Sequence, residues 1–190
     1  MKKVRVPLEN HSYDILIGQD LILNFPDYLE GVLSRKFIAI VTDKNVENLH
    51  LSRLVTALSE AGIETKTLSI DPGEGSKSWK TLQTTVEWML ANKIERNDMV
   101  VALGGGVVGD LVGFAAAILR RGIRFIQCPT SLLAQVDSSV GGKTGINTQH
   151  GKNLVGSFYQ PSKVISDIST LITIKERDFL AGYGEVVKYG

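Results

Sequence analysis

Several absences in this sequence narrow the class of protein before any motif is considered. There is one cysteine, Cys128, so no internal disulfide can form, which favours a reducing compartment. No apolar run reaches the roughly 18 residues that a membrane-spanning helix needs, and the start MKKVRVPLEN turns polar too early for a signal peptide. Lys and Arg number 21 against 20 Asp and Glu, and a net charge of +1 offers no general basic face for nucleic acid or an anionic membrane. We therefore expect a cytoplasmic protein with neither nucleic acid nor a membrane as its partner.

What the sequence does contain is an alternation of strand and helix patterns with 19 glycines among 190 residues. Continuous apolar runs such as 37–41 and 99–103 are typical of strands buried on both faces. The expected strands are 2–9 and 13–17 (joined at 10–12), 37–41, 65–70, 99–103 and 125–128. The expected helices are 25–33, 49–61, 76–92 with Ser76 as its cap, 104–120, and one around 179–187. The alternation predicts an α/β fold, a Rossmann-like, mostly parallel sheet with flanking helices, which binds ligands at the carboxyl ends of its strands.

A glycine turn, GGGVVGD at 104–110, stands between an expected strand and an expected helix and matches G-x-G-x-x-G. Such turns let the backbone approach a pyrophosphate, and the free amides at the helix start favour anionic oxygens. The acidic residue that usually follows about twenty positions later to hold a ribose is missing here, although Asp43, after an earlier strand, could take its place. The alternative is a tight strand–helix turn without a ligand.

A second glycine-rich stretch, 137–156, shows little periodicity, and we expect a long polar loop there. Lys143 and Lys152, nine residues apart, could bind phosphate or carboxylate, or the loop could simply be solvated. The segment GKT at 142–144 resembles the end of a P-loop, but Asp137 stands where that motif needs glycine, so this interpretation fails.

Other chemically capable residues have simpler explanations on sequence alone. The histidines, His11, His50 and His150, lack zinc-motif spacing, and we expect surface or capping roles for them. Glu185 and Lys188 could form an ordinary surface ion pair on the last helix.

Four segments in this order, GGGVVGDLVGF, RRGIRFIQCPTSLLAQVDSSVGGKTGIN, GKNLVGSFYQP and GYGEVVKYG, resemble the 3-dehydroquinate synthase family of sugar-phosphate cyclases. The resemblance implies an N-terminal NAD-binding α/β domain, here 1–170, and the truncated start of a helical metal- and substrate-binding domain, here 171–190. It implies conversion of 3-deoxy-D-arabino-heptulosonate 7-phosphate to 3-dehydroquinate and phosphate through transient oxidation by NAD, phosphate elimination, re-reduction and aldol closure. It also implies a divalent metal (zinc or cobalt), a sugar-phosphate substrate and a homodimer, with the fragment alone inactive.

The resemblance also implies site residues by matching position. For NAD they are Asp43, Asn45, Glu74, Lys77, Gly105, Gly106, Val107, Asp110, Thr130, Ser131, Lys143, Lys152, Thr173 and Asp178. For catalysis and substrate they are Arg121, Asp137, Lys143, Asn153 and Lys188, and the metal ligand is Glu185.

Two departures from the family's pattern occur near the end: Lys175 stands where the family usually has proline, and Asp178 where it usually has glutamate. Three other interpretations stay open: another sugar-phosphate cyclase, a metal-dependent NAD alcohol dehydrogenase, and a non-catalytic NAD-binding module.

Overall fold

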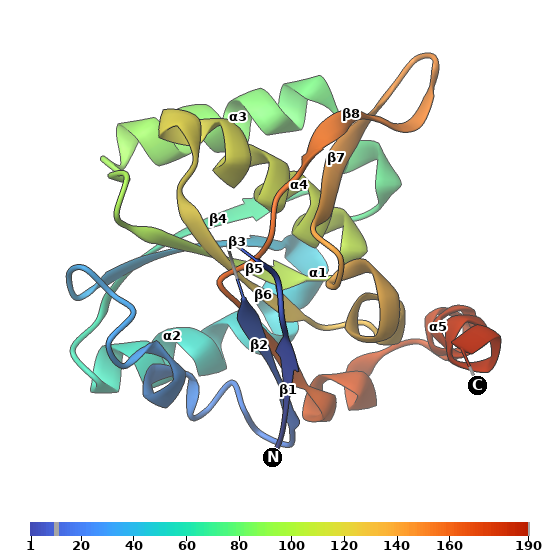
Figure 1. Cartoon of the computed structure of the whole chain (residues 1–190), viewed down its shortest axis with the longest axis horizontal. Coiled ribbons are helices and arrows are strands. Elements are labelled where there is room, and N and C mark those ends of the chain that lie inside the picture. Colours follow the sequence, from blue (N-terminus) through green and yellow to red (C-terminus); the bar gives the residue numbers. More distant parts are fainter. Residues whose placement is uncertain (10–11, 190) are drawn as a thin grey trace.

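The fold is described from a computed structural model, which covers residues 1–9 and 12–189 (Figure 1). The predicted connection of the first two strands at 10–12 lies largely outside these residues. The strands are β1 (Lys2–Val6), β2 (Tyr13–Gly18), β3 (Phe37–Asp43), β4 (Glu64–Ile70), β5 (Met99–Gly104), β6 (Arg124–Pro129), β7 (Lys143–Thr148), β8 (Gly151–Phe158) and β9 (Lys163–Asp167). The helices are α1 (Lys44–Val46), α2 (Ser52–Glu60), α3 (Trp79–Ala91), α4 (Gly106–Ile118) and α5 (Glu176–Tyr189).

Seven strands form one sheet in the order β1-β2-β9-β6-β5-β3-β4, and every neighbouring pair except β1–β2 is parallel. After β4 the chain returns past β3 to form β5, so the direction of winding reverses between β3 and β5. In open parallel sheets this switch point leaves a crevice at the carboxyl ends of the strands, where ligands bind. The predicted fold class is confirmed.

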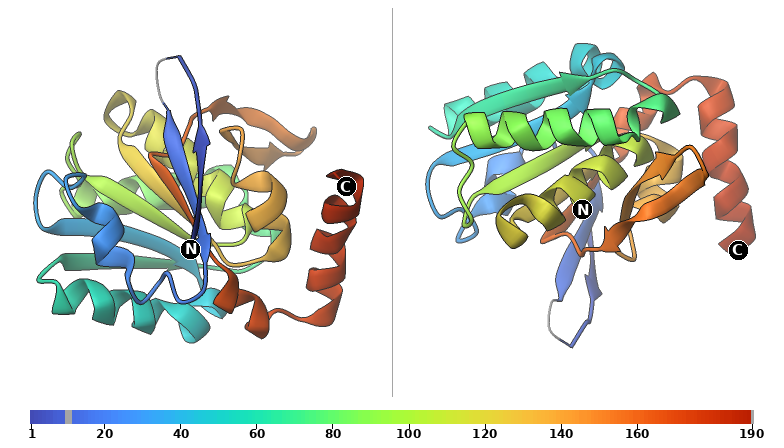
Figure 2. Two further views of the ribbon diagram at one scale, coloured as in Figure 1. Left: turned by 60° about the horizontal axis from the view of Figure 1, so that its bottom comes forward. Right: turned by 90° about the horizontal axis from the view of Figure 1, so that it is seen from above.

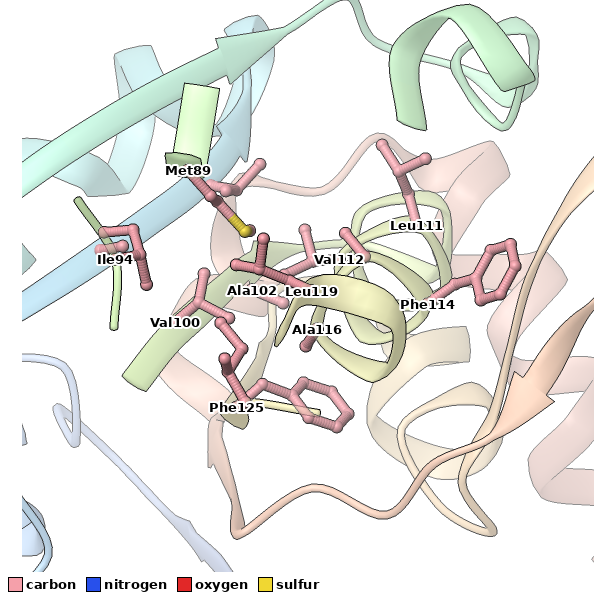
Figure 3. Close-up of a cluster of buried hydrophobic side chains, with 14 of the residues drawn as sticks. Met89, Ile94, Val100, Ala102, Leu111, Val112, Phe114, Ala116, Leu119 and Phe125 are labelled. Atoms are coloured by element: carbon pink, nitrogen blue, oxygen red, sulfur yellow. The ribbon is translucent and has the colours of Figure 1, made fainter. Parts of the chain in front are cut away.

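Both faces of the central strands are buried, which explains their continuous apolar runs. Ile38 and Ile40 of β3 pack on the α2 side, whereas Ala39 and Val41 pack on the side of α3 and α4. Figure 3 shows the second cluster, in which Met89 of α3 and side chains of α4 meet those of β5 and Phe125. Each strand therefore needs apolar residues at successive positions rather than at every second one.

The predicted polar loop at 137–156 is wrong in part. A helical turn, Ala134–Ser138, is followed by β7 and β8, which form an antiparallel hairpin that extends beside α4 (Figure 2). Glycines make this packing possible, since a Cβ on Gly113 of α4 would come within 2.5 Å of Thr144. The hairpin thus packs closely against α4, although its sequence lacks the apolar alternation of a typical strand.

Two helix predictions also need correction. The expected helix 25–33 is only a 3₁₀ turn, Phe25–Leu29. Ser78 caps α3 by accepting a hydrogen bond from the Thr81 amide (3.3 Å), whereas Ser76 donates its hydroxyl hydrogen to the Asp71 carbonyl (2.6 Å). Strand β9 was not predicted at all.

Helix α5 stands at one side of the molecule, after a connection that leaves β9 (Figures 1 and 2). It rests on the 132–138 segment through Gly182, where a Cβ would come within 2.5 Å of the Leu133 amide. None of the helices in the described part of the chain is long and apolar enough to cross a membrane.

Candidate functional site

A cleft of ≈ 650 Å³, here called the switch-point cleft, lies where β3, β5 and β6 end. Residues that follow these strands face the segment that leads into α5, so positions far apart in sequence meet there. Nine of the residues predicted to bind NAD line this cleft: Asp43, Asn45, Gly105, Gly106, Val107, Thr130, Ser131, Thr173 and Asp178.

The glycine turn begins α4 at the floor of this cleft. Gly105 is the N-cap and supplies no side chain to cap the first-turn amides, which therefore remain available to a bound anion. The turn is also crowded, because a Cβ on Gly106 would come within 2.9 Å of the Ser138 hydroxyl. A helix start with free amides and little side-chain bulk suits a pyrophosphate.

Asp43 ends β3 at the cleft wall. Its Oδ1 accepts hydrogen bonds from the amides of Asn45 (2.9 Å) and Val46 (3.1 Å), which fixes the carboxylate in place. Oδ2 has no partner among residues 1–9 and 12–189, so it can accept a hydrogen bond from a ligand hydroxyl. This is the geometry a ribose-binding carboxylate needs, and it sits on a different strand from the glycine turn.

His50, expected at the surface, is buried (2% exposed) in the wall of the switch-point cleft. The Thr173 hydroxyl donates to the Thr170 carbonyl (2.8 Å), so it accepts from His50 Nε2 (2.9 Å), which assigns the ring hydrogen to Nε2. Burial, aided by the Arg53 charge, lowers the pKa of His50 despite the opposing charge of Asp167. A neutral imidazole therefore fixes the Thr173 hydroxyl. Sequence reasoning missed this role because a lone histidine carries no spacing signal.

A second cleft of ≈ 550 Å³, here called the hairpin cleft, lies between the β7–β8 hairpin and the 137–140 segment. Asp137, Lys143 and Asn153, all predicted to face the substrate, line it together with Asp110. Asn153 has a left-handed backbone (φ 57°), which asparagine tolerates better than most residues. A cation, an amide and two carboxylates thus converge on one polar cavity.

Lys77 joins two residues that line the hairpin cleft, Asp110 and Asn153. Its buried Nζ lies 2.5 Å from Asp110 Oδ2 and 2.5 Å from Asn153 Oδ1. Burial raises the pKa of Asp110, and the Lys77 hydrogen bond and charge oppose that shift. Lys77 and Asp110, both expected to contact NAD, form a buried ion pair. Asn153, expected to contact the substrate, accepts a hydrogen bond from the same ammonium group.

The remaining predicted residues lie outside the linings of both clefts. Glu74 accepts a hydrogen bond from Asn147 Nδ2 (2.7 Å), and Lys152 is exposed on β8. On α5, Glu185 and Lys188 form an ion pair (2.9 Å), which raises the pKa of Lys188, with the Asp137 charge acting in the same direction. The surface ion pair foreseen from their spacing is therefore present.

Arg121 is not brought to either cleft. It follows α4, whose thirteen residues span about 20 Å from the glycine turn to the opposite edge of the sheet. Its neighbour Arg120 bonds the Ile94 carbonyl (2.8 Å), which lies just before β5 begins. Within one copy of the chain, Arg121 lies at the amino ends of the strands, and its substrate role stays a prediction.

The described residues contain no group of three or more His, Cys, Asp or Glu side chains that could hold a metal ion. Glu185 therefore belongs to no such group of three within the described residues. A metal in contact with Glu185 would need further donors, so the described residues alone do not fit a complete metal centre.

Fold and site together define an α/β domain with a dinucleotide-type cleft at the switch point of its sheet and a polar, lysine-bearing cleft beside it. Residues 67–181 match the family described as 3-dehydroquinate synthase N-terminal. The chain is 58% identical over 187 residues to the 3-dehydroquinate synthase of Roseobacter denitrificans, covering 98% of this chain and 50% of that protein. It belongs to the 3-dehydroquinate synthase family, and it spans about half the length of the curated relatives it matches.

Solved structures of related cyclases share the fold. 2-Deoxy-scyllo-inosose synthase, crystallised with carbaglucose-6-phosphate, NAD⁺ and Co²⁺, gives a TM-score of 0.90 at 26% identity, over 98% of this chain and 51% of that one. The 2-epi-5-epi-valiolone synthase of Streptomyces hygroscopicus subsp. jinggangensis, with NAD⁺ and Zn²⁺, gives 0.87 at 31% identity, over 96% and 50%.

Proposed function

We propose that the protein containing this chain is a 3-dehydroquinate synthase. It converts 3-deoxy-D-arabino-heptulosonate 7-phosphate to 3-dehydroquinate and phosphate, in the biosynthesis of aromatic compounds. The single observation that carries the proposal is that nine residues predicted to bind NAD line one cleft, while Lys143, Asp137 and Asn153, predicted to face the substrate, line a second. The relatives named 3-dehydroquinate synthase support it.

NAD is the coenzyme of this proposal and would lie in the switch-point cleft, where it would accept a hydride from the substrate and return it. Asp43 would hold a ribose through Oδ2, and the first-turn amides of α4 would bind the pyrophosphate. Thr173, fixed by His50, and Asp178 would contact the end of the coenzyme near the α5 connection. Glu74, Lys77 and Lys152 would complete the contacts from the 74–77 turn and the hairpin.

The substrate would occupy the hairpin cleft. It carries a carboxylate and a phosphate, so the ammonium groups of Lys143 in the cleft and Lys188 on α5 would neutralise charge, while Asn153 and Asp137 would orient hydroxyl groups. These residues act by binding and orientation, because phosphate elimination and ring closure need the reacting atoms held in a fixed arrangement.

The boundary between domains falls at residue 170 in this proposal, and 171–190 begins the second domain. Residues on α5 such as Leu180 (59% exposed) and Val187 (63% exposed) leave an apolar surface that a further domain would cover. Glu185 would be one ligand of a divalent zinc or cobalt ion, with the other ligands supplied by that domain. A homodimer in the cytoplasm is part of the same proposal.

The test uses the full-length protein and measures phosphate release from the heptulosonate phosphate with added NAD⁺. The expected result is NAD⁺-dependent phosphate release without accumulation of NADH, lost on Lys143→Ala but retained in Lys36→Ala, a lysine far from both clefts. Accumulation of NADH with a simple alcohol would instead indicate a dehydrogenase. Coenzyme binding with no turnover of any sugar phosphate would indicate a non-catalytic module.

The second candidate is a different sugar-phosphate cyclase, favoured by the close structural match to two such enzymes. These enzymes share the fold, so substrate choice would depend on the residues that contact the substrate, those of the hairpin cleft among them. Turnover of a sugar phosphate that lacks a carboxylate, with none of the heptulosonate phosphate, would select this alternative. The distinction depends on the carboxylate of the substrate, which only the heptulosonate possesses.

A further inference from the structure

Asn147 of β7 makes three hydrogen bonds to residues assigned above to coenzyme and substrate, although it is not itself among them. Its Nδ2 donates to Glu74 Oε1 (2.7 Å), and its Oδ1 accepts from the Asn153 amide (2.9 Å). Its own amide donates to the Lys77 carbonyl (2.8 Å). One half-buried side chain thus connects the 74–77 turn with the residue that carries the hairpin's left-handed backbone.

An irregularity in the β7–β8 pairing leaves the polar groups of Asn147 free to form hydrogen bonds outside the ladder. The pairing of β7 with β8 is irregular between Ile146 and Thr148, where Asn147 is left out of the ladder together with residues 152–154 of the facing strand. A bulge of this kind turns a side chain away from its regular direction. Here it directs both the amide group and the backbone N–H of Asn147 toward the 74–77 turn.

The partners also require an amide at this position. Glu74 accepts a hydrogen, while the Asn153 amide donates one, so the side chain must donate and accept at the same time. Aspartate would keep the bond to Asn153 but would place a second carboxylate against Glu74. The bond to Asn153 also supports a backbone conformation (φ 57°) that few residues adopt without outside contacts.

We propose that Asn147 is a positioning residue that couples the coenzyme side of the site to the substrate side. This rests on the proposed function. Through Asn147 the position of Glu74 fixes the backbone of Asn153, while Lys77 holds the Asn153 side chain, so a change on one side alters binding on the other.

A double-mutant cycle on the full-length protein tests this coupling, with the dissociation constant of NAD⁺ and the KM for the heptulosonate phosphate at saturating NAD⁺ as readouts. Asn147→Asp should raise both by about tenfold, the scale of one lost hydrogen bond to a charged group plus repulsion. Adding Glu74→Gln reverses the direction of the hydrogen bond between positions 147 and 74, because the new amide can donate to the new carboxylate. The double variant should therefore bind better than the product of the two single effects predicts, by at least about threefold.

Thr148→Val is the matched control, since it removes a hairpin hydrogen bond (to the His150 amide, 3.2 Å) without touching either cleft. Because Thr148 lines neither cleft, this variant should leave both constants within about twofold of the wild type, against about tenfold for Asn147→Asp. Asn147→Ser, which is too short to reach both partners, should repeat the defect without added charge, and thermal unfolding of each variant checks that it is folded.

Strict multiplicativity in the cycle, or equal defects in Thr148→Val and Asn147→Ser, would overturn the proposal. Failure of the proposed function would look different, because the wild type would not turn over the heptulosonate phosphate, yet the cycle could still be completed with NAD⁺ binding alone.

Discussion

The buried ion pair between Lys77 and Asp110 makes a quantitative prediction about stability. The Lys77 side chain is 5% exposed and that of Asp110 is 18% exposed, with 2.5 Å between Nζ and Oδ2. Replacement by methionine in Lys77→Met keeps most of the side-chain volume but removes the cation. Breaking a buried pair by removing one partner costs about 3–5 kcal/mol of unfolding free energy, because the other charge is left uncompensated. For a chain of this size, each kcal/mol of lost stability lowers the melting temperature by about 2–4 °C. The melting temperature should therefore fall by about 6–20 °C.

The pH dependence of this loss has a definite sign. Burial already raises the pKa of Asp110 against the opposing effect of Lys77, and removing Lys77 raises it further. At pH values between the pKa of Asp110 in the unfolded chain and its raised pKa in the folded variant, the folded protein binds more protons than the unfolded chain does. The stability of the variant therefore falls as pH rises through that window. The deficit of Lys77→Met relative to the wild type should therefore be larger at neutral pH than in mild acid.

Urea denaturation of the purified protein at several pH values measures both effects. Lys77→Met combined with Asp110→Asn should recover much of the loss, because no buried charge remains. Lys44→Met is the matched control, since its pair with Asp71 is as short (2.6 Å) but exposed, and it should leave the urea midpoint unchanged. Equal shifts in Lys77→Met and Lys44→Met, or a loss for Lys77→Met below about 1 kcal/mol, would refute the reasoning from burial.

Three further predictions concern the hairpin, α5 and the cleft wall. Gly156→Ala should destabilise the hairpin and weaken substrate binding. The added Cβ would come within 2 Å of the Thr144 carbonyl oxygen, a backbone atom that cannot move aside. A urea midpoint within error of the wild type would contradict this. Gly184→Ala meets no atom within 4 Å and should stabilise α5 by up to about 1 kcal/mol, seen as a raised melting temperature. Because the pKa of His50 is lowered in the folded protein, stability should be lost as pH falls below about 6.5 toward that lowered pKa, and His50→Gln should flatten this part of the profile in pH-dependent denaturation.

The central sheet could be predicted because its signals are local. Residues 37–41 of β3 and 99–103 of β5 are apolar at every position, which is typical of strands with two buried faces. The β7–β8 hairpin lacks such a signal, since glycine, threonine and asparagine dominate it, and its pairing depends on close approach to α4. Strand β9 is five residues long and is recognisable only through its partners β2 and β6, which come from distant parts of the chain.

The site divides in the same way between local and tertiary information. The glycine turn and the position of Asp43 after its strand follow from residue order, and both reach the switch-point cleft. The burial of His50 depends on Thr173, 123 positions later, and sequence alone gives no reason to connect them. Resemblance to a family assigned roles to Lys77 and Asn153 but not the bond between them.

That bond connects the stability of the fold to the hairpin cleft. Lys77 bonds to Asp110 and to Asn153, which both line that cleft, and the Asp110 carboxylate balances the Lys77 charge. Removing Lys77 or Asp110 leaves the other charge unpaired in a buried setting, which costs more than the hydrogen bond itself. Under the proposed function this cleft holds the substrate, so we expect substitutions of Lys77 or Asp110 to lower stability and substrate binding together.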